Sequence, residues 1–198
     1  MMAKKNATPR PMDLNKIERG VRLILEGTGE DPERPGIKAT PTRVAHMFAE
    51  ILGGINENPE KHLRVIQHER HDEMVLIKNI PLYSMCEHHM LPFFGHCHIG
   101  YLPSGRVFGV SKLARLVDVF ARRLQLQERL TEQISRAIMD AIQPVGVGVM
   151  IEAQHLCMMM RGVEKQHAVM TTSSLLGSFR ENLATRQEFL ALINRPQP

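Results

Sequence analysis

The spacing of hydrophobic and polar residues predicts two amphipathic helices near the start of the chain. The first follows Asp13, which suits an N-cap, and stops at the glycines of residues 27–29. The second covers the segment TPTRVAHMFAEILGG at residues 40–54, with Thr40 as the expected N-cap and Pro41 at the first helical position. The apolar sides consist of Ile17, Val21, Ile24 and Leu25 in the first helix and Val44, Met47, Phe48 and Ile51 in the second.

The pattern changes to short strands from Met74 and returns to helical periodicity near Ser111. Leu113, Leu116, Val117, Phe120 and Leu124 form one apolar stripe, the segment LQLQE at 124–128 interrupts it, and a second stripe runs from Leu130 to Pro144. Strands are predicted at residues 73–85, 96–103 and 104–110, a long strand at 145–162 with a hairpin partner at 165–179, and a closing helix at 184–195. This order favours an α+β fold with an antiparallel sheet.

Length and pattern together predict the domain organisation. The 198 residues fit one domain with a small helical appendage. We expect a disordered leader at 1–12, an N-terminal helical segment at 13–60 and the main domain at 61–198.

Composition narrows the setting and the partners. The formal charge of +4 is modest, and no basic run with interleaved aromatics or known motif indicates nucleic acid. No apolar stretch is long enough to span a bilayer, and the basic N-terminus lacks the apolar segment of a signal peptide. Three cysteines without a disulfide pattern favour a reducing, cytoplasmic setting.

The segment SMCEHHMLPFFGHCHIG at residues 84–100 holds the first candidate chemistry. Cys86 and His89 are three positions apart, so a turn could close both on one zinc ion. If the strand at 145–162 is regular, His155, Cys157 and Arg161 share one face. Cys157 is then the natural third ligand, and three protein ligands leave a fourth position for water, as in catalytic zinc sites.

Plainer interpretations exist for each of these residues. Cys157 could be a small buried hydrophobic residue. Cys97 is another ligand candidate, but its neighbours His96 and His98 would lie on the opposite strand face. We interpret the GHCHIG segment as ordinary strand.

Two long segments resemble GTP cyclohydrolase I. They run from SMCEHHMLPFFGHCHIG to LTEQI and from GVGVMIEAQHLCMMMRG to SFREN, and the likeness extends from about Asp13 to the C-terminal helix. The combination of CEHH, VSKLAR, QxQERLT and HxCMxMRG is highly specific. The segment KQHAVMTTSS departs from the more usual threonine- and serine-rich version.

The resemblance implies an enzyme and an assembly. The expected reaction converts GTP and water to 7,8-dihydroneopterin triphosphate and formate, the first step of pterin and folate biosynthesis. The expected fold is the tunnelling fold, an antiparallel sheet with helices packed on one face. In the expected assembly, subunit sheets join into a barrel and two pentamers stack into a homodecamer with active sites at subunit boundaries.

The resemblance also implies roles for individual residues. The zinc ligands would be Cys86, His89 and Cys157. The proton-transfer residues would be His88 and His155, and Ser111 would lie near the ribose. Guanine would be recognised by Gln127 and Glu128, and the triphosphate by Lys112, Arg115, Arg161 and Arg43.

Chemistry gives these assignments a rationale. Zinc lowers the pKa of bound water, which makes hydroxide available for attack on C8 of guanine. Histidine titrates near neutral pH, so His88 and His155 suit proton transfer to the ring nitrogens. Glu128 can accept two hydrogen bonds from the guanine edge. Lys112 and Arg115 lie three apart at a helix start, where anions bind favourably.

Other interpretations stay open at this point. His88 could be structural, Glu128 a solvated helix-end residue, and the cations a solvated basic face. A non-catalytic purine- or pterin-binding scaffold, or an enzyme of the same fold acting on another pterin or a deazapurine, are alternative functions. The sequence leaves open iron or manganese as the metal, control by pterins or a regulatory protein, and whether the product serves folate or tetrahydrobiopterin synthesis.

Overall fold

The computed structural model describes residues 11–63, 65–66 and 70–196. The chain divides into two compact units, the first ending at Glu57 and the second beginning at Asn58. The predicted leader, apart from Pro11 and Met12, lies outside the described residues. Among the described residues, no helix combines the length and the apolar content that crossing a bilayer requires.

The first unit consists of the two predicted helices and a short 3-10 turn. The elements are α1 (Leu14–Gly27), α2 (Thr40–Ile51) and η1 (Gly53–Asn56). The N-cap prediction for Asp13 is confirmed, because its side chain accepts a hydrogen bond from the Lys16 N–H at 3.0 Å. The prediction for Thr40 is wrong: Thr40 is already helical and the N-cap is Ala39. A hydrogen-bonded turn, with Thr40 N–H donating to Ile37 O at 2.8 Å, leads directly into this helix.

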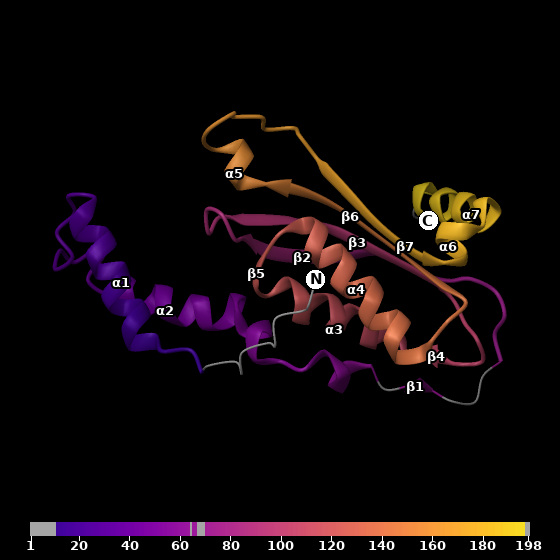
Figure 1. The fold of residues 1–198 in the computed structure, drawn as a ribbon. Coiled ribbons are helices and arrows are strands. Elements are labelled where there is room, and N and C mark those ends of the chain that lie inside the picture. The colour runs from indigo at the N-terminus through magenta and orange to yellow at the C-terminus, as the bar shows by residue number, and fades with distance from the viewer. Residues whose placement is uncertain (1–10, 64, 67–69, 197–198) are drawn as a thin grey trace, which may run out of the picture. The chain divides into compact units, whose positions relative to one another are not determined.

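The second unit is built on a five-stranded sheet (Figure 1). Its strand order is β5-β2-β3-β6-β7, and every neighbouring pair is antiparallel except β2 with β5. The strands are β2 (Val75–Cys86), β3 (Pro92–Leu102), β5 (Leu124–Gln125), β6 (Gly146–His155) and β7 (Met170–Gly177). The α+β class is therefore confirmed, and the predicted antiparallel sheet is found for β2, β3, β6 and β7, while the parallel β5 makes the whole sheet mixed. A separate two-stranded ladder pairs β1 (Val65–Ile66) with β4 (Val107–Phe108).

Two helices cover one face of this sheet (Figure 1). They are α3 (Val110–Ala121), which packs on β2, and α4 (Gln127–Ile142), which packs on β6 and β7. Leu113, Leu116 and Val117 of α3 and Leu130, Ile134 and Ile138 of α4 are buried, as the apolar stripes predict. The interruption predicted at 124–128 is confirmed for residues 124–126, whereas Gln127 and Glu128 already belong to α4. Leu124 lies in β5 rather than on the helical stripe.

The C-terminal helices pack on the opposite face, so the prediction that helices lie on only one face of the sheet is wrong. In β3, Ile99 and Tyr101 point into the core under α3 and α4, so the alternate residue Gly100 faces the other way. A Cβ atom at Gly100 would lie 2.8 Å from the Phe189 ring, and one at Gly148 would lie 2.5 Å from the Phe179 ring. These glycines therefore let α6 (Ser178–Glu181) and α7 (Leu183–Asn194) approach the sheet.

A bulge interrupts the pairing of β2 with β3. Ile77 pairs with Ile99 and Ile80 pairs with Cys97, so two residues of β2 stand opposite His98. The second of them, Asn79, has a φ of 58°, in the left-handed region that asparagine tolerates. Its N–H donates to Nδ1 of His98 at 3.2 Å.

Candidate metal centre

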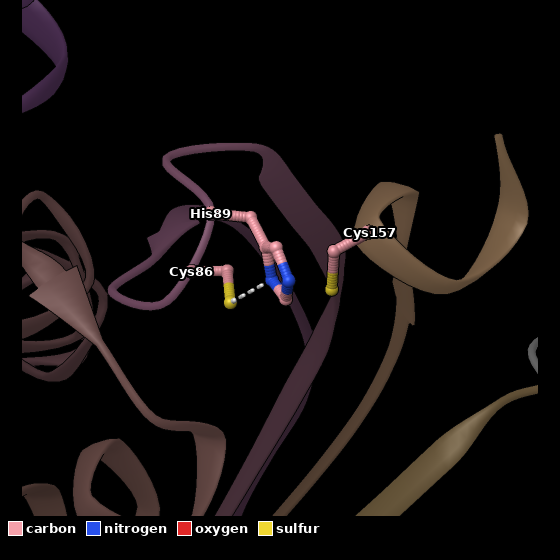
Figure 2. A group of neighbouring side chains, drawn as sticks. All are labelled: Cys86, His89 and Cys157. Carbon is pink, nitrogen blue, oxygen red and sulfur yellow. Dashed lines mark hydrogen bonds between the residues drawn. The ribbon is translucent and has the colours of Figure 1, made fainter. Parts of the chain in front are cut away.

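A tight turn at the end of β2 presents the first two candidate ligands. The N–H of Cys86 donates to Leu91 O at 2.9 Å, and the N–H of Met90 donates to Cys86 O at 2.8 Å. Met90 adopts a left-handed φ of 53°, which reverses the chain into β3. As Figure 2 shows, this turn brings the side chains of Cys86 and His89 to the same side.

The third candidate ligand does not come from a strand, as the sequence predicted. The strand β6 ends at His155, and Cys157 lies in the short helix α5 (Leu156–Met159). Because His155 pairs with Phe93, the next pair would place Leu156 opposite Pro92, which has no N–H to donate. The ladder stops there, and leucine and methionine have good helix propensity. The prediction of one strand over 145–162, with His155, Cys157 and Arg161 on one face, is wrong beyond His155.

The three side chains nevertheless meet (Figure 2). Their ligand atoms all lie within 4.8 Å of one another, and Sγ of Cys86 is 3.9 Å from Nδ1 of His89. Tetrahedral zinc with ordinary bond lengths would separate such atoms by about 3.5–3.8 Å. The ligand atoms therefore need to move together by about 1.3 Å at most to fit zinc geometry.

The environment of the sulfur atoms is partly apolar. Cys86 is buried, Cys157 is half-buried and His89 is exposed, so the group is open on one side. Burial raises the pKa of the Cys157 thiol, and the nearby Cys86 raises it further. A bound cation must displace the thiol protons, and two thiols with one imidazole suit zinc best.

Glu87, to which the sequence assigned no role, connects this turn to α4 through hydrogen bonds. Glu87 accepts two hydrogen bonds from the guanidinium of Arg129, at 2.5 and 3.1 Å. The Arg129 hydrogen bond lowers the pKa of the Glu87 carboxyl. The Glu87 N–H also donates to Gln125 O in β5 at 3.1 Å. The only sequence signal for this clamp was an acidic residue standing between candidate ligands.

His155, the last residue of β6, comes two positions before Cys157 in the chain, and its ring is held from two sides. Its ring stacks on Phe93, with centroids 4.6 Å apart and planes 8° from parallel. Its Nε2 is 2.8 Å from Oε1 of Gln127. Burial lowers the pKa of His155, while the carboxylate of Glu128 opposes that shift.

The predicted role of Gln127 in guanine recognition is not supported by these contacts. Its side chain is 1% exposed, and its amide nitrogen approaches Ile151 O, Met170 O and the Thr172 hydroxyl. Glu128, the next residue, is exposed in the first turn of α4. It therefore stays the candidate for an open carboxylate near His155.

Two further predicted residues lie at the metal group. The rings of His88 and His89 are 6.2 Å apart and nearly perpendicular, so His88 projects differently from the ligand. Nη1 of Arg161 is 3.4 Å from Nε2 of His89. Both His88 and Arg161 are exposed.

Three of the remaining predicted residues lie on α3, at a distance from this group. Ala121, at the C-terminal end of α3, accepts a hydrogen bond from the Ser84 hydroxyl at 2.6 Å, two residues before Cys86. Ser111, Lys112 and Arg115 lie toward the other end of this helix, and at 1.5 Å per residue Ser111 is roughly 15 Å along the axis from Ala121. Arg43 lies on α2 in the first unit, exposed.

The second histidine- and cysteine-rich stretch is ordinary strand, as predicted. Cys97 is 0% exposed in the core, and burial raises the pKa of its thiol. His96 is exposed, and His98 is 3% exposed on the face opposite Cys97. Among the described residues, only Cys86, His89 and Cys157 form a group that could hold a metal ion.

Comparison with known proteins adds the final observation on this site. The family model of GTP cyclohydrolase I matches residues 17–194. The GTP cyclohydrolase 1 of Pelotomaculum thermopropionicum is 57% identical over 182 residues, which cover 91% of this chain and 97% of the relative. That of Carboxydothermus hydrogenoformans is 54% identical over 188 residues, which cover 94% and 98%. The apo crystal structure of archaeosine synthase QueF-Like matches with a TM-score of 0.47 and 18% identity, over 55% of this chain and 97% of that chain.

Proposed function

Because the chain belongs to the GTP cyclohydrolase I family of enzymes, we propose that it converts GTP and water to 7,8-dihydroneopterin triphosphate and formate at a zinc centre. We further propose that this reaction is the first step of pterin and folate biosynthesis. One observation carries it: two thiols and an imidazole from distant segments lie within 4.8 Å of one another. The family supplies GTP as the substrate.

The proposed metal ligands are Cys86, His89 and Cys157. When bound there, zinc would supply a Lewis acid that makes water nucleophilic near neutral pH. The open side of the group and its exposed imidazole leave room for solvent and substrate. All three cysteines are unpaired, so the thiols needed for the cation are present. The two proposed ligand thiols must stay reduced to bind the cation, which supports a cytoplasmic setting.

The proposed proton carriers are His88 and His155. Opening the imidazole ring of guanine requires protons on the departing nitrogens, and histidine exchanges protons near neutral pH. His88 is exposed next to His89, and its ring is nearly perpendicular to the ligand ring. His155 ends β6 two residues before Cys157, with its ring fixed by Phe93.

The proposed guanine-reading group is the carboxylate of Glu128. A carboxylate can accept two hydrogen bonds from the amino group and the ring N–H of guanine, a donor pair that adenine lacks. Glu128 lies in the first turn of α4, exposed, next to the residue that contacts His155. Ser111 is proposed to lie near the ribose.

The proposed triphosphate site takes Lys112, Arg115, Arg161 and Arg43. Arg161 lies at the metal group of the same chain, 3.4 Å from His89. Lys112 and Arg115 lie on the first turns of α3, whose far end contacts the strand of Cys86. With this helix length between them, one triphosphate reaches both regions most directly if Lys112 and Arg115 come from another copy of the chain.

This geometry supports the proposed homo-oligomer. We propose a homodecamer of two pentamers, in which sheets of neighbouring copies join into a barrel. Support comes from strand β7, which has one neighbour in the five-stranded sheet and so offers an unpaired edge. We further propose that residues 61–198 form the catalytic tunnelling-fold domain and residues 13–60 an N-terminal helical segment.

Purified, zinc-loaded protein tests the proposal directly. Incubation with GTP is expected to release formate and to yield a pterin that fluoresces after oxidation. ATP is the matched control substrate and should give neither product. Metal-replete protein that forms neither product from GTP would show that the assignment is wrong.

A further inference from the structure

The side-chain amide of Gln127 has a fixed orientation. Its nitrogen lies 3.0 Å from Ile151 O and 2.9 Å from Met170 O. Carbonyl oxygens only accept hydrogen bonds, so the atom facing them must be the NH₂ group. The other atom of the amide, Oε1, therefore faces His155.

Neighbouring hydroxyls agree with this orientation. The Thr131 hydroxyl donates to the backbone carbonyl of Gln127 at 2.7 Å. The Thr172 hydroxyl, 2.7 Å from the Thr131 hydroxyl, then donates to Thr131. Its lone pairs are left to accept from the Gln127 NH₂ group at 3.1 Å. Both hydroxyl protons thus have one consistent place, and the two protons of the Gln127 NH₂ group are shared among three acceptors.

The orientation of Gln127 decides which nitrogen of His155 carries the proton. Oε1 can only accept, so Nε2 of His155, at 2.8 Å, must be the N–H donor. In the neutral ring Nδ1 is then the acceptor. The stack on Phe93 holds the ring plane, so both the tautomer and the direction of the ring are set.

We propose that Gln127 is a positioning residue that acts through His155: it holds the Nε2–H tautomer, so that His155 exchanges protons with the substrate through Nδ1. This inference rests on the proposed function, because it assumes that His155 serves the reaction. It replaces direct guanine recognition by the Gln127 side chain, for which its amide has no spare donor.

Gln127→Met tests the proposal, because methionine keeps the length of the side chain and removes the amide. We expect kcat to fall about 10- to 100-fold, as for the loss of other groups that orient a functional histidine. The dissociation constant of a non-hydrolysable GTP analogue and the zinc content should stay within about twofold. A large loss of analogue affinity with little change in kcat would instead indicate guanine recognition and overturn the proposal.

Ser135→Ala is the matched control for lost packing. The Ser135 hydroxyl also links α4 to β7, through the Ser174 hydroxyl at 2.7 Å, but without a contact to His155. We expect a lower melting temperature with kcat within about twofold of the parent. An equal loss of kcat in Ser135→Ala and Gln127→Met would show that Gln127 has only a structural role and would contradict the proposal.

A double-mutant cycle tests whether Gln127 acts through His155. In a His155→Ala background, Gln127→Met should cause little further loss of kcat, because the residue that it positions is already gone. Full additivity of the two losses would mean that Gln127 acts independently and would contradict the proposal.

A spectroscopic measurement separates this inference from the proposed reaction. In protein with ¹⁵N-labelled histidine at pH 8, solid-state NMR should show His155 with a protonated Nε2 and an unprotonated Nδ1. The His155→Ala variant assigns the signals by their loss. A protonated Nδ1 would overturn the inference even if GTP is turned over, and a protonated Nε2 would support it even if GTP is not the substrate. The measurement needs no variant of Gln127, so it holds if Gln127→Met fails to fold.

Discussion

Two short segments of this chain are rich in cysteine and histidine, and the fold uses them in opposite ways. In residues 86–89 the chain leaves β2 and turns back, so Cys86 and His89 reach the same side and meet Cys157. In residues 96–98 the chain stays in the middle of β3, so alternate side chains are sent to opposite faces. Cys97 is enclosed in the core while His98 is buried on the other face.

The comparison teaches that position in the strand decides the chemistry. A turn at a strand end can gather ligands that are three residues apart. A regular strand separates direct neighbours, and a central one buries them. Each segment therefore predicts a different response to the same kind of substitution.

The largest expected contrast is between Cys86→Ala and Cys97→Ala. Cys86→Ala removes a proposed ligand, so zinc affinity should fall by more than about 100-fold. That loss exceeds the one expected when a residue that only hydrogen-bonds to a ligand is removed. GTP turnover should be lost together with the zinc. Cys97→Ala should keep zinc affinity within about twofold. Competition with a chromophoric chelator measures both affinities, and similar losses in the two variants would erase the distinction between the segments.

His88→Ala sharpens the comparison inside the first segment. We expect the zinc content to stay at the parental level while kcat falls about 10²- to 10⁴-fold, the usual contribution of a proton-transfer residue. Metal analysis and single-turnover formate release measure the two quantities. Zinc loss as large as in Cys86→Ala would place His88 among the ligands.

Cys97→Ser isolates the structural role of the second segment. Serine has nearly the same shape, but its hydroxyl would be buried in the apolar core that holds Cys97. An unsatisfied buried hydroxyl costs about 1–3 kcal/mol, which should appear in the free energy of unfolding measured with urea. Unchanged stability of Cys97→Ser would show that the hydroxyl finds a hydrogen-bond partner at this position.

The smallest expected effect is a pH dependence from His98. Burial lowers the pKa of His98 below its ordinary 6.5, and the nearby His96 and Lys78 lower it further, against the opposing charge of Glu152. Between the folded pKa and 6.5 the unfolded chain binds more protons than the folded chain, so the free energy of unfolding rises with pH there. The stabilisation is complete above 6.5 and is lost as the pH falls toward the folded pKa.

His98→Gln provides the comparison for this pH dependence. Urea unfolding of metal-free protein at several pH values should give a smaller slope between pH 5 and 6.5 for the variant than for the parent. Identical slopes would mean that His98 does not contribute to it.

Local pattern predicted most of the fold. The apolar stripes of α3 and α4 and the strand at 73–85 follow directly from the spacing of hydrophobic residues, because burial on one face enforces that spacing. The end of β6 could not be predicted from residues 145–162 alone. It depends on Pro92, which the β3–β6 register would place opposite Leu156 if the strand continued.

The site was predicted in part for the same reason. The Cys86 and His89 pair is local. Cys157 does join their group, but it was predicted from the alternation of a strand that in fact ends at His155. The role of Gln127 was hidden, since its partners Ile151, Met170 and His155 are brought together only by tertiary packing. The clamp between Glu87 and Arg129 was hidden likewise, because 42 residues separate the pair.

Gly95 shows how narrowly this fold restricts substitution at one position. A Cβ atom there would lie 1.9 Å from the carbonyl oxygen of Glu152, on a neighbouring strand whose last residue is His155. Even alanine would push the two backbones apart, whereas the adjacent exposed His96 has room for many side chains. In a saturation library selected for growth that depends on this enzyme, survivors should therefore keep glycine at 95 while position 96 diversifies.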